Sequence, residues 1–420
     1  MPDMTDYRPK LHDIQKAKQR ISGVIENTPL ILNRALSERY KAQIWLKRED
    51  LQVVRSYKIR GAYNKISCLS KKELEAGVVC ASAGNHAQGV AFACSRLGIR
   101  GTIFMPKPTP NQKIKQVKMF GRDNVEIVLT GDTYDDACDA AQKWCAEHGN
   151  TFIHPFDDEK IIEGQGTLGL DILNDAQGAI NYLFLPIGGG GLASGVASVF
   201  KMLSPDTKII GVEAGGSASM KKAFEAGGPS ALETMDTFAD GVAVRKVGEI
   251  TYSICKDVVD ELASVPEGQI CATILELYNE SAIVVEPAGA VSIAVLDQYK
   301  EKIKGKSVAC LVSGSNNDIT RMEEIKERAL LHQGLKHYFI LRFPQRAGAL
   351  REFLENVLGS EDDIAHFEYK KKTSRDTGPA VIGIELSRAE DFEPLLRRMD
   401  EHGVGYQYLN DKPDLFQFLV

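Results

Sequence analysis

Residues 182–213 read YLFLPIGGGGLASGVASVFKMLSPDTKIIGVE, and this stretch already indicates the fold class. Its two ends, YLFLPI and KIIGVE, are short apolar runs, which are typical of strands buried on both faces of a parallel sheet. Between them, the residues from Leu192 to Leu203 fit a helix. The stretch therefore predicts a strand–helix–strand unit, in which the helix connects two parallel strands.

The same alternation recurs through the first 330 residues. Further strands are expected at 42–47, 77–82, 101–105, 125–129 and 307–313. Helices are expected at 13–25, 55–69, 86–97, 111–119 and 133–147, and Ser56 is well placed to cap the second of these. Such alternation predicts an α/β fold, with parallel sheets covered by helices on both faces.

The pattern changes after about Gly334. Strands and helices then follow in the order βαββαβ, with the sequences HYFILRF, AGALREFLENVL, DIAHFEYKK, PAVIGIEL, EDFEPLLRRM and GVGYQYL. This order is that of a ferredoxin-like domain. We therefore expect a first part at 1–333 and a separate domain at 334–420.

The composition excludes several classes of protein. The chain has 37 glycines, and 7% of its residues are aromatic. Its net charge of −6 argues against a nucleic-acid-binding protein, which would need a basic face. The eight cysteines lack the spacing of a zinc site and predict reduced thiols in the cytoplasm. The N-terminus has no apolar core of a signal peptide, and no apolar run approaches the ~18 residues of a membrane span, so we expect no membrane association.

The glycine run at 188–191 joins the first strand of the opening stretch to its helix. Without side chains, its backbone amides can converge on a phosphate at the positive end of the helix dipole. A dinucleotide site is the competing hypothesis. Gly188, Gly190 and Ala193 match G-x-G-x-x-A, and Glu213 ends the next strand, as that fingerprint requires. A third hypothesis is that the glycines form a tight turn that binds no ligand.

Three other motifs carry polar side chains at the starts of helices or the ends of strands. Lys58 lies in the first turn of a helix, where the dipole lowers the pKa of its amine and favours the neutral form. Asn85 and His86 follow one strand, and Ser315 follows another, at the strand ends where open α/β sheets bind ligands. His86 also fits a packed helix residue, and the other motifs also fit a surface lysine and ordinary turns.

Taken together, these motifs resemble one family, the threonine dehydratases, which are pyridoxal-phosphate enzymes with the tryptophan-synthase-β fold (fold type II). The matching motifs, in order, are ENTPL, LKREDLQ, SYKIRGA, ASAGNHAQGVA, GQGT, GGGGL, VEPAGA and SGSNN. The resemblance covers about residues 10–330. It implies two α/β subdomains with parallel sheets, the smaller one at about 50–155 inserted in the larger.

The resemblance also implies a role for each motif. Lys58 is the catalytic residue, which holds pyridoxal 5'-phosphate covalently and takes the Cα proton of an amino acid. The other cofactor-binding residues are Asn85, Gly188, Gly189, Gly190, Gly191, Leu192 and Ser315. The substrate carboxylate is expected at the loop Ser82, Ala83, Gly84, Asn85 and His86. Because the glycines then serve a phosphate, Glu213 has a different task.

The implied reaction is β-elimination of water from L-threonine, which gives 2-oxobutanoate and ammonia in the first step of isoleucine biosynthesis. The alternative among enzymes is an L-serine dehydratase or another β-elimination enzyme of the same fold. Threonine and serine differ by one methyl group, and an enzyme can use such a group for only ~1–3 kcal/mol of discrimination between substrates. The alternative that is not an enzyme is an amino-acid sensor without catalytic activity. It would require a defective lysine site, whereas Lys58 and its companion motifs are all present.

The sequence departs from related patterns at three positions. Related racemases carry a serine where this chain has Ala83, which argues against racemisation. The residues after Glu213 lack the acidic ligands of cation-binding relatives, so we expect no required divalent metal. Asp171 replaces the usual glutamate of the family and is expected at the surface or an interface.

The last domain resembles an ACT-like regulatory domain, which implies regulation by an amino acid. We expect the effector at the turn formed by Pro344, Gln345, Arg346, Ala347, Gly348, Ala349 and Leu350. Isoleucine is the expected inhibitor, with valine as an opposing effector. Because such modules bind amino acids between copies, we expect a homo-oligomer, either a dimer or a homotetramer. A domain that only holds the oligomer together is the alternative.

Overall fold

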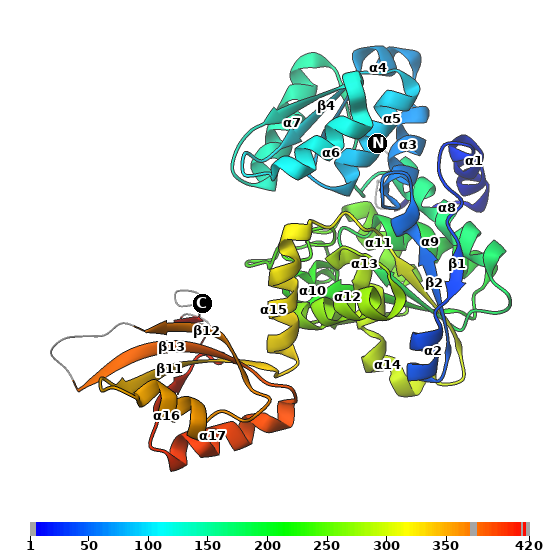
Figure 1. Cartoon of the computed structure of the whole chain (residues 1–420). Coiled ribbons are helices and arrows are strands. Elements are labelled where there is room, and N and C mark those ends of the chain that lie inside the picture. Colours follow the sequence, from blue (N-terminus) through cyan, green and yellow to red (C-terminus); the bar gives the residue numbers. More distant parts are fainter. Residues whose placement is uncertain (1–5, 370–375, 413–414, 417–420) are drawn as a thin grey trace. The chain divides into compact units, whose positions relative to one another are not determined.

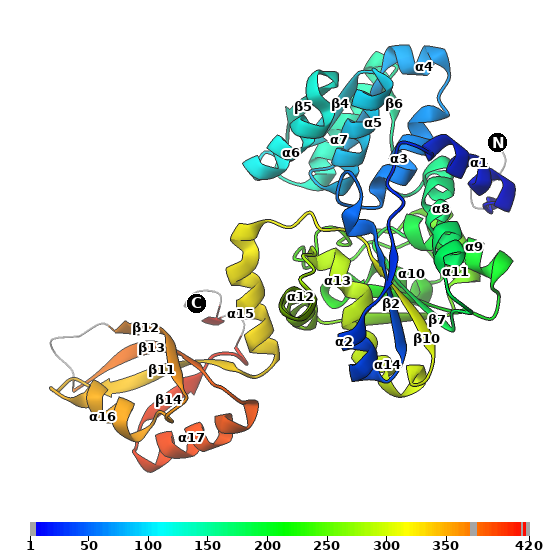
Figure 2. The same cartoon turned by 45° about the vertical axis from the view of Figure 1, so that its right-hand side comes forward.

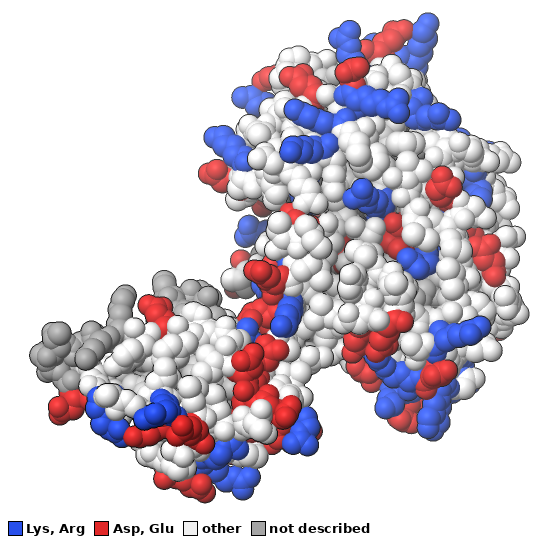
Figure 3. Space-filling view, in the orientation of Figure 1, with Lys and Arg blue, Asp and Glu red and all other residues white. Residues whose placement is uncertain are grey.

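The computed structural model describes residues 6–369, 376–412 and 415–416 of the chain, which divides into two compact units, Met1–Ile319 and Thr320–Val420. Each unit has its own sheets and its own hydrophobic core. On the face drawn in Figure 3, basic and acidic side chains are interspersed over both units. Within the described residues, none of the helices has both the length and the apolar character that crossing a membrane requires.

The larger sheet of the first unit has six strands in the order β1-β2-β10-β7-β8-β9 (Figures 1 and 2). Their bounds, in this order, are Leu30–Leu32, Gln43–Arg48, Ser307–Val312, Tyr182–Pro186, Lys208–Ala214 and Glu261–Val265. Neighbouring strands are parallel except for β1, which runs antiparallel to β2. The strand–helix–strand unit expected from the opening stretch is confirmed as β7, α9 (Gly191–Leu203) and β8.

Helices cover both faces of this sheet. Leu183 and Leu185 of β7 are fully buried in one core with residues of α9 and of two other helices, α8 (Glu159–Asp175) and α11 (Glu249–Val258). Phe184 points to the opposite face, where its ring centre lies 5.0 Å from that of Tyr299 in α14 (Leu296–Ile303). Because successive side chains of a strand alternate between faces, burial on both sides explains the continuous apolar run.

The smaller sheet of the first unit has four parallel strands in the order β5-β4-β3-β6. Their bounds, in this order, are Val125–Leu129, Gly101–Met105, Val78–Ala81 and Thr151–Phe152. Figures 1 and 2 show these strands and their helices as a lobe of the unit. The helices of this lobe are α3 (Lys58–Ser67), α4 (Lys71–Ala76), α5 (Asn85–Leu97), α6 (Asn111–Gly121) and α7 (Tyr134–His148). The sheet lies within the range of 50–155 that we expect for an inserted subdomain.

The prediction that Ser56 caps α3 is wrong. The helix begins at Lys58, with Tyr57 in the N-cap position, and the Ser56 hydroxyl is buried without a hydrogen-bond partner. The chain turns sharply just before this point, because Arg55 has a φ of +61°, in the left-handed region. Residues other than glycine rarely adopt this conformation, so the local sequence gives little warning of the turn.

Further helices of the first unit include α1 (Leu11–Ile21), α2 (Arg34–Tyr40), the short helix η2 (Glu49–Leu51), α10 (Ser219–Ala226), α12 (Glu267–Ser281) and α13 (Pro287–Ala294). The second unit contains α15 (Met322–His332), followed by β11 (Lys336–Pro344), α16 (Ala349–Asn356), β12 (Asp363–Tyr369), β13 (Thr377–Glu385), α17 (Phe392–Glu401) and β14 (Gly405–Tyr408). Its antiparallel sheet has the order β12-β13-β11-β14. The predicted ferredoxin-like order βαββαβ is thus confirmed.

Candidate active site

The glycine loop at 188–191 lies between β7 and α9 and is packed from behind. A Cβ atom at Gly188 would lie 2.7 Å from the Val242 carbonyl oxygen, and one at Gly191 would lie 2.8 Å from the Phe156 carbonyl oxygen. At Gly189, a Cβ atom would overlap the Phe156 ring. Only glycine therefore lets the chain pass this close to its neighbours.

The backbone amides of this loop are suited to binding an anion. Within the part of the chain that the structure describes, no hydrogen-bond acceptor is found for the backbone amides from Gly188 to Leu192. The amides of a first helical turn have no partner inside their own helix, and they carry the positive end of the dipole. A phosphate group fits such a set of free donors.

Lys58 begins α3, and its amine lies near the glycine loop. Its Nζ donates a hydrogen bond to the Pro155 carbonyl oxygen at 2.9 Å, and the next residue, Phe156, is the one that packs against the loop. Burial lowers the pKa of the Lys58 amine to about 8, and the nearby Glu286 opposes this effect. A lysine with such a pKa is neutral far more often at neutral pH than an ordinary lysine, which favours its use as a nucleophile or base.

Asn85 begins α5 and faces a buried carboxyl group. Its Nδ2 donates to Glu286 Oε1 at 2.6 Å, while its Oδ1 is buried without a partner. Burial raises the pKa of Glu286 to about 8. The Glu286 amide in turn donates to the Gly314 carbonyl oxygen at 3.2 Å, beside Ser315. The VEPAGA motif was recognised in the sequence, but no role was assigned to its glutamate, Glu286. The feature that could have pointed to this residue is a single carboxylate within an apolar run.

Ser315 lies against the segment that leads to Lys58. Its amide donates to the Arg55 carbonyl oxygen at 2.9 Å, and its hydroxyl donates to the Asp50 carbonyl oxygen at 3.1 Å. A β-bridge between Ser56 and Gly314 adds to these contacts. The structure thus brings together Lys58, Asn85, Ser315 and the glycine loop, and the unpartnered Ser56 hydroxyl and Asn85 carbonyl leave polar atoms available for a ligand.

The loop at 82–86 connects β3 to α5. Its Gly84 amide donates to the Ser82 hydroxyl at 3.1 Å. His86 is packed rather than presented as a base, since its Nε2 lies 2.8 Å from the Ile153 carbonyl oxygen. Burial, with the charge of Lys58, lowers the His86 pKa to about 3, so this ring is neutral. The use of the loop amides for a substrate carboxylate stays a prediction.

Glu213 has a structural task. Its two carboxylate oxygens accept hydrogen bonds from the amides of Met220 at 2.7 Å and Lys221 at 2.9 Å, in the first turn of α10. A ribose, as the dinucleotide hypothesis requires, would have to compete with these bonds. In the described ranges, no group of three or more His, Cys, Asp or Glu side chains is placed to hold a metal ion. The expectation of no required divalent metal stays a prediction.

Asp171 was expected at the surface or an interface, but it lies inside the first unit. Asp171 is buried, and its carboxylate lies 2.7 Å from the Arg60 guanidinium and also binds Lys18. The GQGTLGLD segment belongs to α8, whose inner face packs against α3, so helical spacing turns this aspartate inward. A shorter acid at this position therefore still reaches a buried cation.

The second unit has a pocket of about 470 Å³ at the predicted effector turn. Five of the seven predicted residues line it: Pro344, Arg346, Gly348, Ala349 and Leu350. Gln345 and Ala347 are outside this lining, whereas Phe343, Arg351, Phe367 and Tyr369 belong to it. The Arg346 guanidinium forms two hydrogen bonds with the Glu352 carboxylate, at 2.7 and 2.5 Å.

Comparison with known proteins gives matches along nearly the whole chain. Residues 21–314 match the family described as pyridoxal-phosphate dependent enzyme, and residues 327–419 match the C-terminal regulatory domain of threonine dehydratase. The biosynthetic L-threonine dehydratase IlvA of Bacillus subtilis is 55% identical over 407 residues, which cover 97% of this chain and 96% of that protein. The corresponding protein of Halalkalibacterium halodurans is 54% identical over 411 residues, covering 98% and 99%.

Solved structures resemble the chain over about three quarters of its length. The processed form of threonine deaminase isoform 2 from Solanum lycopersicum has a TM-score of 0.72 and 42% identity, covering 77% of this chain and 95% of that one. Maize serine racemase has a TM-score of 0.71 and 29% identity, covering 78% and 99%.

Proposed function

This chain belongs to the pyridoxal-phosphate dependent enzymes, among the threonine dehydratases with a C-terminal regulatory domain, and from this membership we propose how its residues divide the work. It is a threonine ammonia-lyase of isoleucine biosynthesis, which converts L-threonine to 2-oxobutanoate and ammonia. The observation that carries this function is identity of 54–55% to biosynthetic threonine dehydratases over almost the full length of both chains.

The residues of the site fit the cofactor. Lys58 would hold pyridoxal phosphate covalently, the amides from Gly188 to Leu192 would bind its phosphate, Asn85 would contact its ring oxygen, and Ser315 its ring nitrogen. When bound, the cofactor supplies an electron sink for the electron pair that remains when the Cα–H bond of the substrate breaks. Lys58, with its pKa near 8, takes the proton from that carbon.

Two neutral side chains favour elimination over racemisation. The Ser315 hydroxyl cannot hold an additional proton on a ring nitrogen as a carboxylate would, which makes the electron sink weaker and favours prompt loss of the β-hydroxyl group. Ala83 provides no base on the opposite face of the substrate. The amides of the loop at 82–86 bind the substrate carboxylate in this scheme and orient the Cα–H bond toward Lys58.

The substrate experiment compares L-threonine with L-serine. We expect a higher kcat/KM for threonine, with 2-oxobutanoate as the product. The two substrates differ by one methyl group, which contributes ~1–3 kcal/mol to the discrimination between them. The kcat/KM for threonine is therefore expected to exceed that for serine about tenfold or more. A preference for serine would assign the chain to the serine dehydratases, and a protein that binds NAD but no pyridoxal phosphate would overturn the assignment.

The second unit binds the effector in this proposal. The apolar side chains of Phe343, Leu350 and Phe367 suit a branched aliphatic side chain, and the Arg351 guanidinium suits a carboxylate. We therefore assign isoleucine to this pocket as inhibitor, with valine opposing it. An effector regulates only if it binds two states of the enzyme unequally.

The assembly and the compartment follow from the same proposal. One regulatory module per chain requires a second copy to complete a site between modules, so the enzyme works as a dimer or tetramer. All eight cysteines are free, which supports the reducing cytoplasm as the place of work.

A further inference from the structure

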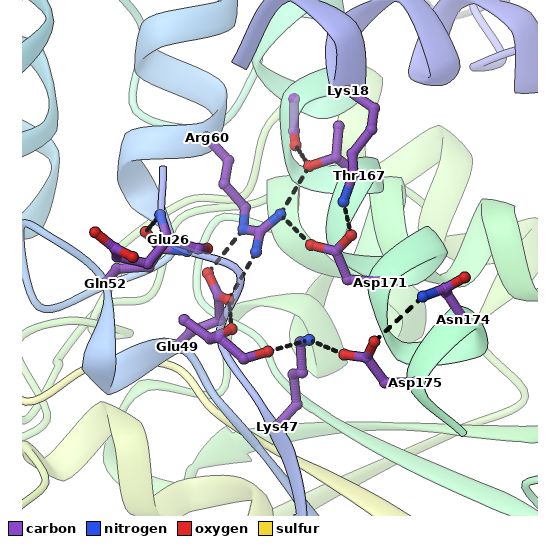
Figure 4. Close-up of polar contacts among 12 residues, drawn as sticks. Lys18, Glu26, Lys47, Glu49, Gln52, Arg60, Thr167, Asp171, Asn174 and Asp175 are labelled. Atoms are coloured by element: carbon purple, nitrogen blue, oxygen red, sulfur yellow. Dashed lines mark hydrogen bonds and ion pairs between the residues drawn. The ribbon is translucent and has the colours of Figure 1, made fainter. Parts of the chain in front are cut away.

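A network of charged side chains, most of them buried, lies beside α3, the helix that begins with Lys58 (Figure 4). It joins three cations to three carboxylates, so its formal charges cancel; its members are Lys18, Lys47, Arg60, Glu49, Asp171 and Asp175. Lys47, Glu49 and Arg60 are fully buried. Burying charges is costly even when they are paired, and well-packed apolar residues often serve stability equally well. The network therefore calls for a reason beyond stability.

Arg60 is the centre of this network. Its Nε and Nη2 donate to the two carboxylate oxygens of Glu49, each at 2.8 Å, in a two-point contact. Its Nη1 donates to Asp171 Oδ2 at 2.7 Å and to the Thr167 hydroxyl at 3.1 Å. Figure 4 shows the guanidinium between the two acids. A planar guanidinium fixes both the distance and the orientation of its partners, which an ammonium group cannot do.

The contact between Arg60 and Glu49 closes a short loop of the main chain, and this loop contains Lys58. The carbonyl groups of Asp50 and Arg55, which accept both hydrogen bonds from Ser315, belong to the same loop. The loop also includes the left-handed turn at Arg55. Such a backbone conformation persists only where its surroundings hold it in place.

We propose that Arg60, through its two-point contact with Glu49, is a positioning residue that fixes Lys58 relative to Ser315. This inference rests on the roles proposed above for those two residues. Lys18 and Lys47 already supply positive charge to the network, so the special contribution of Arg60 is its geometry. A misplacement of about 1 Å at the reacting groups can lower a rate about 100-fold.

The test compares Arg60→Lys with Lys47→Met in the full-length enzyme loaded with pyridoxal phosphate. Lys47 is a matched control, because it is an equally buried cation of the same network and both of its hydrogen-bond acceptors, Asp175 and the Thr28 carbonyl oxygen, lie outside the closed loop. The measurements are the visible circular dichroism of the bound cofactor, kcat and KM for threonine, and the thermal midpoint. In Arg60→Lys we expect an altered dichroic band and a kcat about 10–100-fold lower, with KM little changed. In Lys47→Met we expect a lower thermal midpoint with the wild-type band and kcat.

Two results would overturn the proposal. One is an Arg60→Lys enzyme with the wild-type dichroic band and kcat. The other is a fall in kcat that follows the loss of stability equally in both variants, which is the behaviour of a purely structural network. If Arg60→Lys does not fold, Glu49→Gln is measured in its place, with the same expected change and the same overturning results. A wild-type protein without a cofactor band would contradict the proposed function instead.

Discussion

Asn85 Nδ2 donates a hydrogen bond to Glu286 Oε1 at 2.6 Å, although the two residues are 201 positions apart in the chain. This bond joins the start of α5, in the smaller lobe, to the residue that precedes α13. Because the pKa of Glu286 is raised to about 8 by burial, its carboxyl group is mostly protonated at pH 7. It therefore holds the Asn85 amide without placing a full charge beside the site.

Substitutions of Glu286 test the importance of this hydrogen bond. Glu286→Ala removes the acceptor for Asn85, so we expect pyridoxal phosphate to bind more weakly, by about 1 kcal/mol or fivefold. Glu286→Gln is the matched control, because the glutamine carbonyl can still accept the bond. Fluorescence titration of the apoenzyme with pyridoxal phosphate gives both dissociation constants. Equal affinity of the alanine variant and the wild type would show that the bond does not position Asn85.

Glu286 also predicts a pH dependence of stability. Its pKa rises from 4.5 to about 8 on folding, so between these values the folded protein holds a proton that the unfolded chain releases. The free energy of unfolding contributed by this group therefore falls as the pH rises through this window. Thermal unfolding from pH 5 to pH 8 should show a shallower decline for Glu286→Gln than for the wild type. Parallel curves would contradict the raised pKa.

Lys58 predicts the pH dependence of cofactor loading. Its amine has a pKa of about 8 in the folded protein rather than 10.5, and only the neutral form attacks an aldehyde. The rate at which the apoenzyme combines with pyridoxal phosphate should therefore rise with pH and level off above about 8. Stopped-flow absorbance measures this rate. An inflection near the ordinary lysine value would contradict the role of burial.

Gly84 tests the substrate loop. A Cβ atom at Gly84 would meet no protein atom within 4 Å, so Gly84→Ala should fold and load cofactor as the wild type does. If the loop binds the substrate carboxylate, the added methyl group should raise KM for threonine about tenfold. Gly178→Ala is the control, since that glycine is also surrounded by open space but lies far along the chain from the loop. An unchanged KM in Gly84→Ala would place the carboxylate elsewhere.

Leu350 tests the regulatory pocket. Leu350 and Leu354 lie on the same helix, α16, and are similarly exposed, at 40% and 42%, but only Leu350 lines the pocket. We expect Leu350→Glu to abolish the shift in thermal midpoint predicted for isoleucine, because it places a charge where the aliphatic side chain of the effector is proposed to bind. Leu354→Glu should retain the shift. An equal response of both variants would place the effector outside this pocket.

Much of the fold could be predicted from the sequence. Buried parallel strands leave continuous apolar runs, and the strands and helices of the last domain follow one another in a clear order. The three-residue β1 and the two-residue β6 were missed, since elements this short have no measurable period. Longer elements of the first unit, such as α8, β9 and α12, were not predicted either. Ser56 was misplaced because the left-handed turn at Arg55 has no local sequence signal.

The motifs of the site could also be predicted, but the contacts between them could not. The bond between Asn85 and Glu286 joins distant segments, and the inward turn of Asp171 toward Arg60 depends on how α8 packs against α3. A single sequence shows which residues are available, and only the packed structure shows which of them meet.

Whether Lys58 holds the cofactor is tested by borohydride reduction of the purified enzyme, followed by peptide mass spectrometry. Reduction fixes the cofactor to the amine that holds it. We expect a yellow protein that bleaches on reduction and yields one pyridoxyl-modified peptide, which contains Lys58, while Lys58→Ala yields none. A modified peptide without Lys58, or a protein that deaminates threonine with no modified lysine, would contradict this role of Lys58.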